Sequence, residues 1–216
     1  MSYLVHGSPI SRMTRVTWML EEIGAPYELV HARLGSRDLV GLSPSNKGPV
    51  LVDDGFVLTD SAAICLYLAD KHAEAGFGPR DARERALMES WMLFALAEFE
   101  AVMWTKIKHR ILLPEEMRLD VGPWLSREFE RELKTLHRRL GDNEYAMGDR
   151  FTCVDVVLGH CGRWAMYARF PIDSERVAAY FERVLARPAY GRAVAAEEAL
   201  AARGGADRTA PPAEPA

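Results

Sequence analysis

The stretch KGPVLVDDG at residues 47–55, followed by LTDSAAICLYLAD at residues 58–70, decides the fold of this chain. Pro49 stands directly before an apolar run, and because proline has no amide proton for a sheet ladder, it belongs at a turn or a sheet edge. The Asp-Asp-Gly triplet at 53–55 lies between two apolar runs, which is a strong signal for a hairpin turn. We therefore expect a β-hairpin that leads into a helix, with Ser61 at the N-terminus of that helix.

The residues before this hairpin predict a strand, a helix and a second strand. Short apolar runs at 3–5 and 27–30 are typical of strands, and apolar residues from Val16 to Ile23 lie along one helical stripe that Gly24 ends. The segment 34–42 is expected to be short and helical or irregular. The order βαβ then ββα indicates a small thioredoxin-like α/β domain.

The rest of the chain has a helical pattern. Residues 83–112 form a nearly uninterrupted apolar periodicity, which corresponds to a helix roughly 45 Å long at 1.5 Å per residue. Further helices are expected at 124–140, 154–167, 174–185 and 189–202. We predict the following division: a thioredoxin-like domain at 1–76, a linker at 77–82, an all-helical domain at 83–203, and a disordered tail at 204–216 that has no large apolar residue.

Composition excludes several classes of function. The formal net charge of −4 argues against nucleic acid as a partner, because that affinity rests on Lys and Arg neutralising phosphates. No apolar run approaches the roughly 18 residues of a membrane span, and no secretory signal pattern is present at the N-terminus. We expect a cytoplasmic protein with no membrane partner.

Cysteine and histidine spacing gives no sign of a metal site. The three cysteines, Cys65, Cys153 and Cys161, lie in apolar helical surroundings without a CxxC pattern. We interpret them as reduced thiols in the core, where free cysteine is commonly buried. The histidines have no ligand-like spacing, so no metal cofactor is predicted.

The stretch at residues 47–61 resembles the glutathione site of the glutathione S-transferase family. Other motifs similar to those of the family occur in the family's order over residues 3–203. SPISR at 8–12, leading into WMLEEIGAPYE at 18–28, is similar to the first loop, first helix and second strand. YAMGDRFTCVD at 145–155 is similar to the capping segment of a core helix in the second domain, and RPAY at 187–190 to the start of the last helix. The resemblance implies the glutathione S-transferase fold.

The resemblance also implies a serine-type mechanism in which a hydroxyl near the first helix donates a hydrogen bond to the glutathione sulfur. Ser11 is our candidate for this role, with Ser8 in the same loop as the alternative and Thr14 as a third, weaker one. Ser11 could instead only cap the helix. Tyr3 would suggest a tyrosine-type mechanism, but it lies inside the first predicted strand. The loop has no cysteine, which disfavours the members that form mixed disulfides.

Three residues, Pro49, Asp60 and Ser61, match the family's glutathione-binding motif, and Gly48 occupies a fourth position of it. Ser61 and the helix amides would hold the γ-glutamyl carboxylate, and Asp60 would compensate the α-ammonium group. Gly48 and Pro49 would present the backbone to the cysteinyl unit, which predicts a cis peptide bond at Pro49. The family more often has valine at the position of Gly48, so affinity for glutathione could be reduced here.

The glycyl carboxylate needs a basic residue before the proline. Arg37 is the favoured candidate, with Arg33 and Lys47 as alternatives. The sequence is equally consistent with Arg37 being a solvated surface residue that binds no ligand.

The electrophile would bind near the first loop and the long helix, which makes Ile10, Met103, Trp104 and Ile107 candidates for the acceptor pocket. Residues of this type at helical spacing are more often part of a core. Separately, Thr152 and Asp155 form the T-x-x-D pattern of a helix capping box, which is a structural role.

The sequence therefore predicts a glutathione transferase that uses glutathione as co-substrate and attacks a hydrophobic electrophile. Isomerase, dehalogenase and ether-cleaving activities of serine-type members are not separated by the sequence. The alternative is a non-catalytic binding or regulatory protein with the same fold. The resemblance also implies a homodimer.

Overall fold

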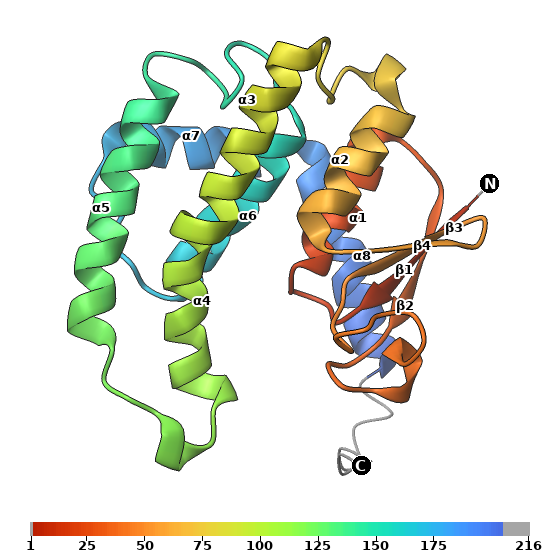
Figure 1. Ribbon diagram of the computed structural model, residues 1–216. Helices are drawn as coiled ribbons and strands as arrows, with labels where there is room; N and C mark the ends of the chain where they lie inside the picture. Colours follow the sequence, from red (N-terminus) through yellow and green to blue (C-terminus); the bar gives the residue numbers. More distant parts are fainter. Residues whose placement is uncertain (1, 205–216) are drawn as a thin grey trace. The chain divides into compact units, whose positions relative to one another are not determined.

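The computed structural model describes residues 2–204, which form two compact units (Figure 1). The first unit contains the chain up to Gly76 together with the chain from Ala186, and the second contains Phe77–Leu185. The tail expected to be disordered lies, beyond Gly204, outside the described residues. None of the helices described between residues 2 and 204 is long and apolar enough to cross a membrane.

The first unit is built on a mixed four-stranded sheet in the order β2-β1-β3-β4. β1 pairs in parallel with β2, whereas β3 runs antiparallel to both β1 and β4. Asp54 and Gly55 in the turn between β3 and β4 have φ angles of 48° and 84°, as a two-residue hairpin turn requires. The predicted hairpin and βαβ–ββα order are confirmed. The strands are β1 (Tyr3–Gly7), β2 (Tyr27–His31), β3 (Val50–Asp53) and β4 (Phe56–Thr59).

Three α-helices accompany this sheet: α1 (Met13–Ile23), α2 (Ser61–Lys71) and α8 (Pro188–Gly204). Short 3₁₀ turns cover Arg37–Leu39 and Ala73–Ala75. In the apolar stripe of α1, Val16, Met19 and Leu20 are fully buried and Ile23 is half-buried. Gly24 ends the helix with a left-handed φ of 68°. The fold therefore places the loop before α1 and the N-terminus of α2 on the same small domain.

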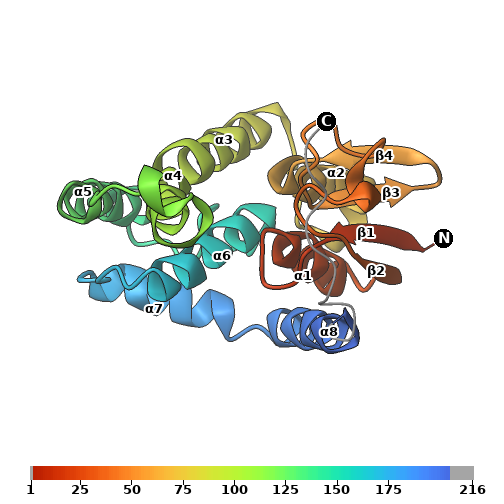
Figure 2. The ribbon, with the colours of Figure 1, turned by 90° about the horizontal axis from the view of Figure 1, so that it is seen from below.

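The last helix, α8, packs against α1 and β2, as Figure 2 shows. Trp18 and Tyr190 meet with ring centroids 4.8 Å apart, and the Arg187 guanidinium forms two hydrogen bonds of 2.6 and 2.7 Å with the Glu22 carboxylate. The sequence placed this helix in the helical domain. The structure differs from that division because the apolar face of α8 is buried on the thioredoxin-like unit.

The second unit is all helical, as expected. One helical segment runs from residue 82 to residue 112, and it includes α3 (Ala82–Leu93), a π-helical stretch (Phe94–Glu100), α4 (Ala101–Ile107) and a second π-helical stretch (Lys108–Leu112). It is followed by a 3₁₀ turn (Glu115–Met117) and by α5 (Gly122–Leu140), α6 (Cys153–Tyr167) and α7 (Glu175–Leu185). The predicted long helix is confirmed, with π-helical turns that the periodicity did not reveal.

The start of α6 carries the predicted capping box. The Asp155 carboxylate accepts the Thr152 amide at 2.8 Å, while the Thr152 side chain caps the helix in return. Asp155 also accepts hydrogen bonds from the Thr152 hydroxyl at 3.1 Å and from the Ala146 amide and the Tyr180 hydroxyl, both at 2.8 Å. This carboxylate therefore ties three segments of the second unit together and is more than a helix cap.

Candidate functional site

The loop at residues 8–12, which we call the site loop, connects β1 to α1 and carries the candidate hydroxyls. Gly7 ends β1 where a side chain would collide with Met13, whose sulfur lies 2.9 Å from the position of a Cβ atom. Ile10 has a φ of 57° and an exposed side chain. A β-branched residue rarely adopts this left-handed conformation, so the surrounding contacts must hold it there.

The two candidate serines lie at opposite ends of this loop. The Ser11 hydroxyl donates to the Ser8 carbonyl at 2.6 Å and accepts the Met13 amide, the first amide of α1, at 3.2 Å. The Ser8 hydroxyl donates to the Ala32 carbonyl at 3.1 Å, away from the helix. Ser11 therefore lies at a helix N-terminus, where the helix dipole favours a negative charge, and Ser8 is bonded to the segment after β2.

The two weaker candidates are engaged elsewhere in the first unit. The buried Thr14 hydroxyl donates to the Glu197 carboxylate at 2.9 Å. The Tyr3 hydroxyl is 2.7 Å from His72 Nε2, and burial raises the pKa of Tyr3. These contacts give both residues a structural role.

The Gly48–Pro49 peptide bond is cis, which confirms the prediction, and β3 begins at the next residue. Gly48 approaches the backbone of β1 closely. A Cβ atom at Gly48 would lie 3.0 Å from the Gly7 Cα and 3.2 Å from the His6 carbonyl oxygen. The close contact with β1 gives a steric reason for glycine at a position where the family more often has valine, because a larger residue would require β1 to shift.

The N-terminus of α2 forms a corner suited to an anion. Ser61, the first residue of this helix, is buried, and its hydroxyl accepts a hydrogen bond of 3.2 Å from Arg15 Nη1. Arg15 is a fully buried cation on α1. A helix N-terminus, a hydroxyl and a guanidinium together favour a carboxylate.

Asp60 precedes this corner with a φ of 68° and an exposed side chain. Its carboxylate does not cap the amides of α2, a helix that the structure describes along its whole length. A non-glycine residue in the left-handed region, placed beside an anion-binding corner, is typical of functional sites rather than of ordinary helix starts.

The structure does not choose among the basic candidates for the glycyl carboxylate, since Arg33, Arg37 and Lys47 are all exposed. The segment that carries them, residues 33–47, is held by hydrogen bonds and apolar contacts of its own. The Ser43 hydroxyl accepts the Lys47 amide at 3.2 Å. The small cluster beneath the segment consists of Ala32, Leu39, Leu42 and Val50.

The acceptor-pocket candidates belong to different units. Ile10 is on the site loop, whereas Met103, Trp104 and Ile107 are on α4. Met103 and Ile107 are buried, and the Trp104 ring stacks on Trp164 with centroids 5.8 Å apart. Their role in binding an electrophile stays a prediction.

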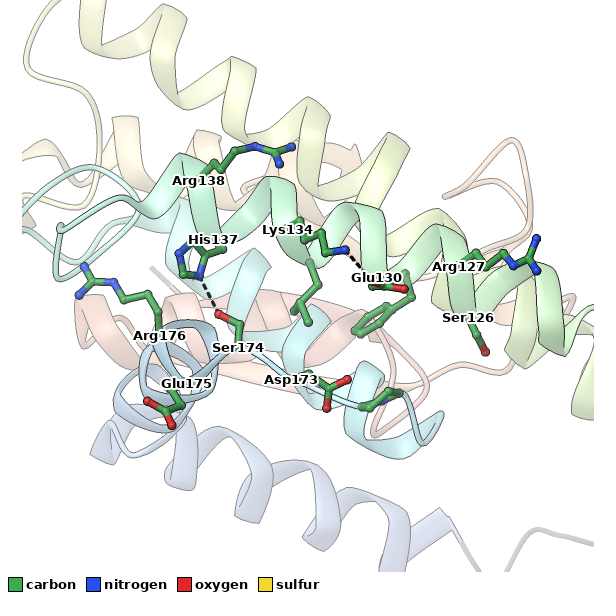
Figure 3. A pocket seen from close by; sticks show the side chains of 13 residues that line it. Ser126, Arg127, Glu130, Lys134, His137, Arg138, Asp173, Ser174, Glu175 and Arg176 are labelled. Carbon is green, nitrogen blue, oxygen red and sulfur yellow. Dashed lines mark hydrogen bonds and ion pairs between the residues drawn. The ribbon is translucent and has the colours of Figure 1, made fainter.

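A cavity of about 840 Å³ lies in the second unit, between α5 and the start of α7 (Figure 3). Its walls include Phe129 and Leu133, and the His137 ring nitrogen is 2.8 Å from the Ser174 hydroxyl at its edge. None of the residues singled out in the sequence lines it. Within residues 2–204, no three His, Cys, Asp or Glu side chains are grouped closely enough to hold a metal ion.

Sequence reasoning missed two buried charged residues of the first unit, Arg15 and Glu197. Arg15 follows Thr14 within an apolar helix pattern, and a cation at such a position is a weak signal of a buried partner. Glu197 is followed by a second glutamate in an alanine-rich helix, and nothing in the sequence distinguishes the two.

The chain is similar to known proteins in sequence and in fold. Residues 4–76 match the family model described as the N-terminal domain of glutathione S-transferase. Over 169 residues the chain is 33% identical to glutathione S-transferase 3 of Schizosaccharomyces pombe, covering 70% of this chain and 69% of that protein.

Solved structures of similar proteins have the same fold. A glutathione transferase of Methylococcus capsulatus is 28% identical with a TM-score of 0.80, and the match covers 91% of this chain and 99% of that one. A sphingomonad glutathione S-transferase in complex with glutathione is 25% identical with a TM-score of 0.79, covering 90% of this chain and 98% of that one.

Proposed function

The chain belongs to the glutathione S-transferase family, and we propose that this transferase binds glutathione on its first unit and ionises the thiol for attack on an electrophilic small molecule. The observation that carries this proposal is the corner at the start of α2. There a buried serine, a buried arginine and an exposed aspartate with left-handed backbone gather at one helix N-terminus.

This corner matches the charges of the γ-glutamyl end of glutathione. Its carboxylate would accept hydrogen bonds from the Ser61 hydroxyl and the first amides of α2. The Arg15 guanidinium, which donates to Ser61, would add a positive charge next to it. Asp60 would face the α-ammonium group, so each charge of the peptide end meets an opposite charge. The solved sphingomonad relative in complex with glutathione supports glutathione as the co-substrate.

Ser11 would stabilise the thiolate. A free thiol has a pKa of about 8.5, so it is mostly protonated at neutral pH. For this role the Ser11 hydroxyl turns its proton from the Ser8 carbonyl to the sulfur, and a hydrogen bond to a charged acceptor is the stronger of the two. The Met13 amide, which Ser11 already accepts, polarises the hydroxyl in the right sense.

The reaction itself follows from the ionised thiol. The proton leaves the sulfur to solvent, and the sulfur electron pair forms a bond to an electrophilic carbon. In a substitution the leaving group departs with the electron pair of the bond that breaks. In an addition the π electron pair moves from the attacked carbon to the rest of the electrophile, which then takes a proton from solvent. The protein contributes by holding the two reactants together and by raising the thiolate population.

We further propose a homodimer, since dimers are typical of this family. The identity of the electrophile and the roles of Ile10, Met103, Trp104 and Ile107 in binding it stay predictions.

The mechanism is tested by comparing Ser11→Ala with Ser8→Ala. Loss of one hydrogen bond to a charged group costs about 1.5–3 kcal/mol, which corresponds to roughly ten- to a hundredfold in rate. Ser11→Ala should lose this much conjugation rate while it keeps its affinity for glutathione, because the α2 corner still binds the peptide. If Ser8→Ala loses the rate instead, the hydroxyl is misassigned.

A third variant, Ser61→Ala, tests the binding corner separately. It should weaken glutathione affinity, because Ser61 would contact the γ-glutamyl carboxylate and not the sulfur. A wild-type protein that binds glutathione without ionising its thiol would be a binding or regulatory protein rather than a transferase.

A further inference from the structure

A buried carboxylate on α8 is bonded directly to the site loop. Glu197 is 1% exposed, and its Oε2 accepts the Ile10 amide at 2.7 Å and the Thr14 hydroxyl at 2.9 Å. Its other oxygen, Oε1, accepts the Thr17 hydroxyl at 3.0 Å. All three donors lie within eight consecutive residues of the chain, and Ser11 is among those eight.

These contacts are strong enough to fix the loop. A buried carboxylate is tolerated only when its oxygens are hydrogen-bonded, and such bonds to a charged acceptor are about twice as strong as neutral ones. The bond to Ile10 acts at the residue whose φ of 57° is unfavourable for a β-branched side chain. Glu197 therefore holds the backbone of the residue that directly precedes Ser11.

We propose that Glu197 is a positioning residue for the thiol-activating hydroxyl. By holding the Ile10 amide and the first turns of α1, it sets where the Ser11 Oγ lies, although Glu197 itself does not touch glutathione. This inference rests on the proposed role of Ser11. It adds that the C-terminal helix determines the chemistry of the N-terminal loop.

Other contacts besides those of Glu197 hold α8 on α1, so Glu197 can be replaced without releasing the helix. The Arg187–Glu22 pair and the contact of Trp18 with Tyr190 hold the same helix on α1. Arg192 adds a further hydrogen bond of 2.6 Å to Glu21. We expect Glu197 variants to retain the fold, with the damage concentrated at the site loop.

Three variants separate geometry from charge. Glu197→Ala removes the acceptor from the Ile10 amide. Glu197→Gln removes the charge and keeps the shape, because its amide oxygen can accept Ile10 and Thr14 while its NH₂ group donates to Thr17. Glu198→Gln is the matched control, since Glu198 is the next residue on α8 and is exposed.

The first readout needs no glutathione. Hydrogen exchange of the Ile10 amide, measured by NMR, should be at least tenfold faster in Glu197→Ala than in wild type and unchanged in Glu198→Gln. The second readout is kinetic. In Glu197→Ala the turnover number should fall about tenfold and the pKa of bound glutathione thiol should rise by about one unit, which is the same tenfold change, with glutathione affinity within twofold. Glu197→Gln should stay within twofold throughout.

These measurements distinguish a positioning role of Glu197 from a purely electrostatic one. Unchanged Ile10 exchange, turnover and thiol pKa in a folded Glu197→Ala variant would overturn the proposal, and an equal decrease of the thiol pKa in the Ala and Gln variants would show that only the charge matters. If the alanine variant does not fold, the same measurements on Glu197→Asp, which is one methylene shorter, decide the question. A wild-type protein that forms no thiolate would contradict the proposed function, and the exchange result would still judge the loop contact.

Discussion

Replacing Asp155 with alanine should destabilise the second unit far more than the loss of a helix cap would. The side chain is fully buried and accepts hydrogen bonds from the Ala146 amide, the Thr152 amide and hydroxyl, and the Tyr180 hydroxyl. Alanine leaves four buried donors, two amides, the Thr152 hydroxyl and the Tyr180 phenol, without their acceptor. A helix cap alone contributes about 1 kcal/mol.

The expected magnitude follows from these four donors. Each buried donor left without a partner costs about 1–3 kcal/mol, which sums to roughly 4–12 kcal/mol before relaxation. The carboxylate no longer has to be desolvated, and this offsets part of the cost, so we expect about 3–5 kcal/mol, the range seen when a buried charged network is broken. For a protein of this size the melting temperature should fall by roughly 10 °C.

The assay is urea unfolding followed by circular dichroism, with two further variants. Tyr180→Phe removes one donor only and should cost about 1–2 kcal/mol, and the double variant should cost less than the sum because both changes affect one network. Asp142→Ala, an exposed aspartate in the preceding loop, should stay within about 0.5 kcal/mol of wild type. A loss of about 1 kcal/mol or less for Asp155→Ala would refute the reasoning and leave only the cap.

Three other predictions concern pH, thiols and assembly. Hydrogen bonds from the Arg80 side chain lower the pKa of Glu84 to about 2, so the stability that Glu84 provides is present above its ordinary value of 4.5 and is lost as pH falls toward 2. Urea unfolding should find Glu84→Gln less stable than wild type at pH 7, with the difference closing between pH 4.5 and 2, and a difference independent of pH would contradict this. All three cysteines are buried, and burial raises the pKa of Cys65 to about 12, so a chromogenic disulfide reagent at pH 8 should detect thiols only after unfolding. Sedimentation at micromolar concentration should give about twice the chain mass of 24.2 kDa, and the mass of a single chain would exclude the homodimer.

The parts of the fold that were predictable are those governed by local sequence. The Asp-Asp-Gly turn and the T-x-x-D cap of α6 each depend on a few neighbouring residues, and both are confirmed. The cis bond at Pro49, which is also confirmed, was implied by the resemblance to the family. The long helix at 83–112 was visible because its apolar period extends over many turns.

The parts that were missed depend on contacts between distant segments. Arg15 and Ser61 are 46 residues apart, and Glu197 meets Ile10 across 187 residues, so no local pattern reports either contact. Gly48 was interpreted as a weakened binding position. Its close approach to the β1 backbone, which only the paired sheet reveals, gives a steric reason for glycine there.

The central claim is that the first unit ionises the thiol of bound glutathione, and the most direct test is an ultraviolet titration of the wild-type complex. Thiolate absorbance should appear with an apparent pKa at least one unit below the value of about 8.5 for a free thiol, so that most of the bound peptide is ionised at neutral pH. A bound thiol that titrates at the free value, with glutathione shown to be bound at the same concentrations, would contradict the account.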